Sequence, residues 1–160
     1  MRRDLIALPD NSRVWIYQCK SKIDESHADI IKKWLYQFTM QWNSHGVAVE
    51  SYAHLFHNKF IVFVADESNL VSGCSIDSSV AVLKKIEDEL GLSFFDRLNY
   101  AYMDNDDVKQ VSSSEFRGAV EKGDINTETL MFDNLVNNKK DFINDWLKPL
   151  DQSWYMKFIN

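Results

Sequence analysis

The stretch KFIVFVAD, from Lys59 to Asp66, decides the expected fold. Its central residues are apolar without interruption, whereas a strand with one face in water alternates apolar and polar residues. We therefore expect a strand that is buried on both faces, at the centre of a sheet. The preceding stretch VAVESYAHLF, from Val47 to Phe56, predicts a second strand that joins the first through a tight turn at His57 and Asn58.

An amphipathic helix is expected before these strands. Asp24 or Ser26 can cap its first turn, and apolar residues then recur at helical spacing as far as Trp42. His45 and Gly46 follow as a stop signal, because glycine suits the left-handed conformation after a helix. The apolar stripe consists of Ile30, Ile31, Trp34, Leu35, Phe38 and Trp42, with Lys32, Lys33, Gln37 and Gln41 mostly on the opposite side.

The order of the elements predicts an α+β fold. A β-branched and aromatic strand at Arg13 to Cys19 precedes the first helix, and a second helix from Ser79 to Leu90, stopped by Gly91, precedes a strand at Arg97 to Met103. This β-α-β-β-α-β order is that of a ferredoxin-like core, a mixed or antiparallel sheet with its helices on one face. The expected C-terminal additions are a strand at Val108–Ser112, a helix at Ser113–Glu121, a strand beginning in Glu128–Val136 and a helix at Asn138–Leu147.

Length and cysteine usage predict one soluble, cytoplasmic domain spanning residues 1–160. A chain of 160 residues buries roughly two thirds of its unfolded surface. Cys19 and Cys74 without a CxxC motif exclude a framework of several disulfides. Leu5 to Leu8 is too short for the core of a signal peptide, and the longest apolar run, Phe60 to Ala65, is far too short to span a membrane.

The charge and the glycine pattern exclude several functions. A net charge of −6 with scattered lysines and arginines argues against general nucleic-acid binding, which needs a basic face. Gly118 and Gly123 have the spacing of a phosphate-binding P-loop, but Asp124 and Ile125 follow where lysine and a hydroxyl residue are required. Nucleotide hydrolysis is therefore not expected. No metal ligand set emerges either, and we predict neither a metal nor another cofactor.

The octet SGCSIDSS, from Ser72 to Ser79, is the best candidate for a functional site. It leads from the buried strand into the second helix, where free amides and the helix dipole favour negative charge. The candidate catalytic residues are Cys74, Ser75 and His45. The candidate ligand-binding residues are Gly73, Cys74, Ser75, Asp77, Ser78 and Arg97.

Three interpretations of this octet stay open. In the first it is a structural turn, in which Asp77 or Ser75 caps the helix and Cys74 is buried. In the second it is a turn that binds a ligand or an anion. In the third Cys74 or Ser75 is a nucleophile with a histidine as its base. The serine hydrolase pattern G-x-S-x-G is only half present, because Asp77 replaces the second glycine.

Several short motifs resemble those of a family of small bacterial proteins often labelled ABC transporter ATPases. They are QWNSHG at Gln41–Gly46, SGCSID at Ser72–Asp77, FFDRLNYAY at Phe94–Tyr102, FDNLV at Phe132–Val136 and SW at Ser153–Trp154. The resemblance spans most of the chain and brings no activity with it. The chain lacks the Walker A loop that such an ATPase needs, so the resemblance does not imply ATP hydrolysis here.

The sequence therefore favours a small binding or interaction protein. Its partner would be a small ligand or another protein, and a homodimer formed through an open sheet edge is a further possibility. An enzyme with a cysteine or serine nucleophile at Gly73–Ser78 is the alternative.

Overall fold

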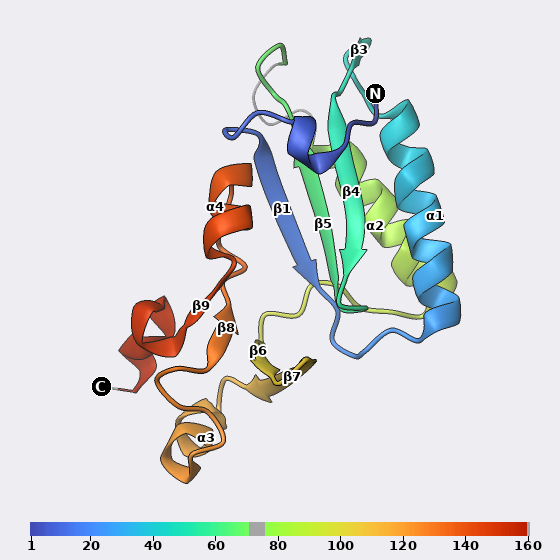
Figure 1. Cartoon of the computed structure of the whole chain (residues 1–160). Coiled ribbons are helices and arrows are strands. Elements are labelled where there is room, and N and C mark those ends of the chain that lie inside the picture. The colour runs from blue at the N-terminus through green and yellow to red at the C-terminus, as the bar shows by residue number, and fades with distance from the viewer. Residues whose placement is uncertain (71–75, 160) are drawn as a thin grey trace. The chain divides into compact units, whose positions relative to one another are not determined.

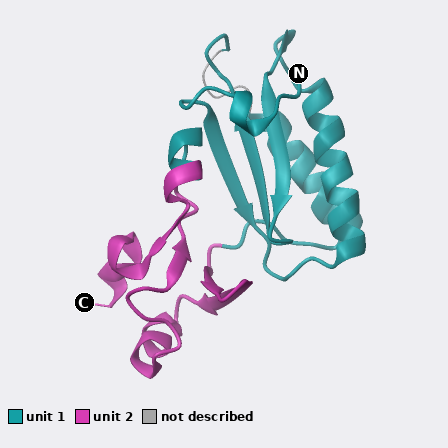
Figure 2. Ribbon diagram, viewed as in Figure 1, with its two compact units in different colours: residues 1–96, 137–142 teal, residues 97–136, 143–160 magenta. Residues whose placement is uncertain are grey.

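The structure is a computed structural model that describes residues 1–70 and 76–159. These residues divide into two compact units (Figure 2). Unit 1 consists of Met1–Asp96 and Asn137–Phe142, and unit 2 of Arg97–Val136 and Ile143–Asn160. Helices and antiparallel sheets occur in the chain together, and this confirms the α+β class. That the whole chain folds as one domain stays a prediction.

The sheet of unit 1 has the predicted central strand. Its order is β1 (Arg13–Gln18), β5 (Phe60–Ala65), β4 (Ser51–Phe56), and both pairings are antiparallel. Every residue of β5 has an exposed fraction of 0%. The turn between β4 and β5 also lies where predicted, with His57 (φ 55°) and Asn58 (φ 51°) in the left-handed region that asparagine and histidine tolerate better than most residues.

Two helices cover one face of this sheet (Figure 1). Helix α1 spans Glu25–Gln41, and the side chain of Asp24 caps it by accepting a hydrogen bond from the His27 amide at 2.9 Å. Helix α2 spans Ile76–Leu90 and therefore begins before the predicted Ser79. It ends as expected at Gly91, which adopts a φ of 66°.

The predicted role of His45 and Gly46 is wrong. Helix α1 ends at Gln41, and the chain then forms a two-stranded ribbon of β2 (Asn43–Ser44) and β3 (Val47–Ala48). His45 (φ 51°) and Gly46 (φ 82°) are the turn of this ribbon, and the side chain of Asn43 accepts a hydrogen bond from the Gly46 amide at 2.8 Å. Two successive residues in the left-handed conformation suit a tight hairpin turn as well as a helix end. The sequence therefore indicates a turn at the right position, but this turn joins two strands and does not end the helix.

Aromatic rings fill the space between the sheet and the helices. Phe63 of β5 lies within 5.9–6.1 Å of Phe38, Tyr17 and Trp42, measured between ring centroids and with the rings nearly perpendicular. Such edge-to-face pairs add about 0.5–1.5 kcal/mol each beyond the burial of apolar area. The core of unit 1 is therefore anchored on the central strand.

Unit 2 has its own four-stranded sheet, ordered β7 (Asp107–Ser112), β6 (Asn99–Asp104), β8 (Leu130–Phe132), β9 (Leu147–Pro149). Helix α3 (Phe116–Lys122) precedes β8, and α4 (Lys139–Asp145) precedes β9. Short 3-10 helices lie at Leu150–Gln152 and Trp154–Phe158 in this unit and at Leu5–Ala7 in unit 1. The sequence does not indicate β9, because the helix expected at Asn138–Leu147 includes the first residue of this short strand.

The ferredoxin-like expectation is met for three of its four strands. The order β1-β5-β4 with α1 between β1 and β4 is a split β-α-β unit. The fourth strand, β6, was predicted to extend this sheet, but it pairs with β7 on one side and β8 on the other. Both of its edges are therefore occupied. One end of the outer edge of β1 is bridged instead by Asn137 and Asn138, with the Val14 amide donating to the Asn137 carbonyl at 3.0 Å.

A buried carboxylate holds unit 2 together. One oxygen of Asp133 accepts hydrogen bonds from the Trp154 indole N–H at 3.1 Å and from the Leu135 amide at 3.0 Å. Its other oxygen lies 3.0 Å from the ammonium group of Lys148. The FDNLV and SW motifs thus meet in one structural cluster, because Asp133 belongs to the first and Trp154 to the second.

The central position of β5 predicts the effect of truncating its side chains. Ile61→Ala should lower the free energy of unfolding by about 2–5 kcal/mol, because it leaves a cavity at a fully buried site. Ile6→Ala makes the same chemical change at a side chain that is 87% exposed, and should alter stability by less than about 0.5 kcal/mol. Urea unfolding of both variants measures this, and equal effects would contradict the central placement of β5.

The Asp133 cluster predicts a second stability effect. Asp133→Ala leaves the Trp154 N–H and the half-buried Lys148 ammonium without their acceptor, and should destabilise unit 2 by about 3–5 kcal/mol. Asp151→Ala, at an exposed position of the same unit, is the matched control. Urea unfolding of both variants, followed by the indole N–H signal of Trp154 in ¹H–¹⁵N NMR, measures the loss. A loss no larger than that of the control would show that Asp133 is not a structural centre.

Candidate functional site

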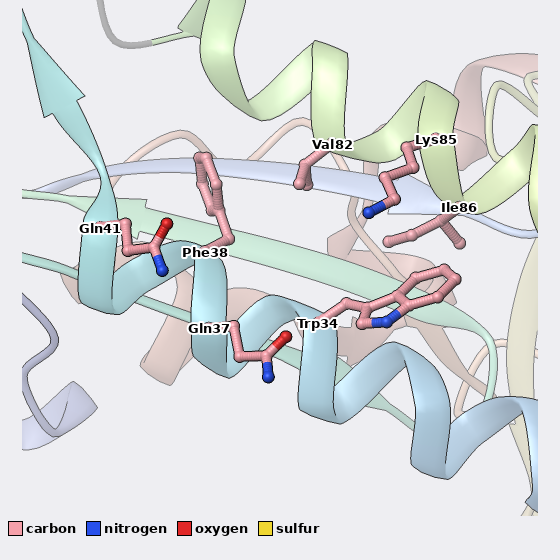
Figure 3. Close-up of a pocket in the computed structure, with 7 residues that line it drawn as sticks. All are labelled: Trp34, Gln37, Phe38, Gln41, Val82, Lys85 and Ile86. Carbon is pink, nitrogen blue, oxygen red and sulfur yellow. The ribbon is translucent and has the colours of Figure 1, made fainter.

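A pocket opens between α1 and α2 on unit 1. Its volume is about 230 Å³. Figure 3 shows side chains from both helices around one space, with Phe38 beside Val82 and Trp34 beside Ile86 and Lys85. The two helices run in opposite directions. Phe38, the later residue on α1, lies beside Val82, the earlier residue on α2, and Trp34 lies beside Lys85. The lining residues are Trp34, Gln37, Phe38 and Gln41 of α1 with Val82, Lys85 and Ile86 of α2.

The width of the apolar stripe on α1 explains why the pocket forms. Ile31 and Leu35 are fully buried and cover the sheet, whereas Trp34 and Phe38 lie at the side of the stripe and are only half-buried. On the other wall Ile86 is fully buried and Val82 half-buried. Val82 is the smallest lining side chain, so it does not fill the space in front of Phe38.

The polar side of the pocket carries a single positive charge. The ammonium nitrogen of Lys85 lies 5.1 Å from the centroid of the Trp34 ring, which is a cation–π contact. Gln37 and Gln41 add exposed amide groups along the rim. None of the described residues that line the pocket is acidic. The described lining residues therefore carry a net positive charge in a chain whose net charge is −6.

The predicted site at Gly73–Ser78 is described only in part. Gly73, Cys74 and Ser75 lie outside the described residues, so the interpretations that depend on them stay predictions. Asp77 is exposed and Ser78 half-exposed. One interpretation places Asp77 at the N-cap of α2, but the structure places it inside the first turn of the helix. The carboxylate of Asp77 there complements the helix dipole.

The other predicted site residues are placed separately. His45 is exposed in the turn between β2 and β3. Arg97 is the first residue of unit 2, and its grouping with Ser78 stays a prediction. Ser78 precedes Val82 by one helical turn and so lies on the same face of α2 as the pocket wall.

The remaining candidates for nucleophilic or metal chemistry do not gather. Cys19 is fully buried. His54 projects from the face of the sheet opposite to the helices, since its neighbours Ala53 and Leu55 belong to the core beneath them. Within residues 1–70 and 76–159, no group of three or more histidine, cysteine or acidic side chains is placed to hold a metal ion. None of the helices in these ranges has the length and apolar character needed to cross a membrane.

The sequence does not predict the pocket, because Trp34 and Phe38 belong to the apolar stripe that is expected to lie entirely in the core. The available signal was the width of the stripe on α1, which has more large apolar residues than one sheet face can cover. A residue in the middle of such a stripe is buried, and a residue at its side meets the neighbouring helix. The partner residues on α2 could not be paired with them without the topology.

Comparisons of the chain with family models, with curated proteins and with solved structures give no match.

The histidines of the β4–β5 hairpin predict a pH dependence of stability. Burial, with smaller contributions from Lys32 and Arg2, lowers the pKa of His54 below 6.5, and burial also lowers the pKa of His57. The unfolded chain then binds protons that the folded chain does not, so stability is fully present above about pH 6.5 and falls as the pH falls.

The double variant His54→Gln, His57→Asn should lose less stability than the natural chain between pH 7 and pH 5. Asparagine is chosen at position 57 because it tolerates the left-handed backbone. Urea unfolding at each pH measures the slope. An unchanged slope would show that these two imidazoles do not cause it.

Proposed function

We propose that this chain is a binding protein without nucleotide hydrolysis, and that the pocket between α1 and α2 is its site for a small organic ligand. The observation that carries the proposal is the half-buried state of Trp34 and Phe38. Trp42 and Phe63 of the same core are exposed by only 2% and 0%. Trp15 and Tyr17 are half-buried as well, but Trp34 and Phe38 are the half-buried aromatics that line the pocket. A ligand in the pocket would complete the burial of Trp34 and Phe38 and gain roughly 25 cal/mol for each Å² of apolar surface removed from water.

The size of the pocket supports a small molecule as the ligand. A protein cavity of about 150 Å³ lined by apolar side chains binds benzene. The 230 Å³ here therefore accommodates one ring with a short substituent. Its walls come from two helices that pack on the same sheet, so the site is largely preformed and needs little ordering on binding.

The chemistry of the walls supports binding and not catalysis. The lining side chains offer apolar surface, two amides and one ammonium group. Among these described residues there is no hydroxyl, thiol, imidazole or carboxylate to act as a nucleophile or general base. Such a set of groups can hold and orient a molecule, but it supplies no proton transfer near neutral pH.

Filling the pocket should abolish ligand binding. Val82→Phe places a ring in the space in front of Phe38, whereas Ala81→Phe puts the same ring at a neighbouring exposed position of α2. One-ring fragments, such as phenylacetamide, are titrated while the indole N–H signals of the five tryptophans are followed by ¹H–¹⁵N NMR. Trp34→Phe identifies the signal of Trp34.

The expected result is a shift of the Trp34 signal in the natural chain and in Ala81→Phe, and no shift in Val82→Phe. Binding that persists in Val82→Phe would place the ligand elsewhere. If no one-ring fragment of any charge moves the Trp34 signal, the pocket is not a ligand site.

A further inference from the structure

The pocket between α1 and α2 has apolar groups along its length and a cation toward one end (Figure 3). At the end away from the cation Phe38 and Val82 face one another. Toward the other end Lys85 reaches back over Trp34, with its ammonium nitrogen 5.1 Å from the centre of the ring. A ligand that satisfies both ends needs an apolar body and a negatively charged group attached to it.

We infer that the ligand is a small apolar monocarboxylate, with an apolar body about the size of one ring; this rests on the function proposed above. The apolar body lies between Phe38 and Val82, and the carboxylate accepts hydrogen bonds from Lys85. The amide of Gln37, one turn along α1 from Trp34, lines the same pocket and can donate to a carboxylate oxygen, whereas Gln41 lies at the far end beyond Phe38 (Figure 3). No bond is made or broken in this binding step.

The single positive charge argues for one negative charge on the ligand. A phosphate carries up to two charges at neutral pH, and proteins hold it with arginine clusters, several cations or helix N-termini. Among the described lining residues Lys85 is the one cation, and the remaining side-chain donors are the neutral amides of Gln37 and Gln41 and the indole N–H of Trp34. A monocarboxylate matches this set without leaving a charge uncompensated.

Lys85 also disfavours a cationic ligand. A cation could bind the face of the Trp34 ring, but the Lys85 ammonium already lies over that ring. A second cation in the same small space would be repelled, and the lining offers no carboxylate among its described residues to offset the repulsion.

The volume of the pocket fits a small molecule. A cavity of roughly 150 Å³ holds benzene. Scaled in proportion, the 230 Å³ of this pocket holds about nine or ten heavy atoms. This is the size of a single ring with an acetate group. A folded partner or a long peptide would need contacts well beyond these seven lining residues.

The test compares three probes of nearly equal size and shape that differ in charge. Phenylacetate is the anion, phenylacetamide its neutral isostere and 2-phenylethylamine the cation. Each is titrated at pH 7 into the full chain, and the dissociation constant is taken from the Trp34 indole signal. Lys85→Gln removes the charge while keeping an amide, and Lys84→Gln is the matched control at an adjacent exposed lysine that does not line the pocket.

Phenylacetate should bind about tenfold more tightly than phenylacetamide, since a hydrogen bond to a charged group contributes enough free energy for that factor. This preference should disappear in Lys85→Gln and persist in Lys84→Gln, and 2-phenylethylamine should bind most weakly. If phenylacetamide binds as tightly as phenylacetate, or if the preference survives Lys85→Gln, the inference is overturned while the pocket remains a ligand site. If no probe moves the Trp34 signal, the proposed function fails together with the inference.

Discussion

The burial of β5 on both faces is the constraint on which the rest of unit 1 depends. Each of its side chains is fully buried, and removing a large apolar side chain from water contributes about 1.5–3 kcal/mol. A strand of this kind needs a neighbour on each edge and a cover on each face. The pairing with β1 and β4 supplies the edges, and α1 and α2 supply one cover.

The pocket is a consequence of how that cover is built. Two helices on a three-stranded sheet must each turn a stripe of apolar side chains toward the strands, and the sides of the two stripes then face each other. Where the facing side chains are large, they close the gap. Val82 opposite Phe38 is too small to do so, and Lys85 extends over Trp34 in place of an apolar contact. A single small residue and a single charged residue thus leave a pocket at the helix–helix contact.

The local pattern of the sequence predicted most of unit 1, because its signals are short-range. The apolar run at β5, the cap at Asp24 and the glycine after α2 each act within a few residues, and all three lie where expected. The sheet membership of β6 could not be predicted this way. It depends on which strand edges are free, and β7 and β8 satisfy both edges of β6 through contacts distant in sequence. The prediction that His45 and Gly46 end the first helix failed for a related reason, because two left-handed residues suit a hairpin turn and a helix end equally well.

The candidate site was harder to predict than the fold. Asp77 and Ser78 were singled out for their chemistry, and the structure places them at the start of the helix that forms one wall of the pocket. The pocket itself is made of residues that look like core or like solvated surface when taken one at a time. Only the antiparallel packing of α1 on α2 brings Trp34 next to Lys85.

The most direct test of the ligand site is to locate a bound probe within the natural chain. Intermolecular nuclear Overhauser effects between phenylacetate and assigned side chains would do this. We predict contacts from the ring protons of phenylacetate to the Val82 methyl groups and to the rings of Phe38 and Trp34. Contacts confined to unit 2, or to the opposite face of the sheet around His54, would contradict the assignment of the pocket between α1 and α2.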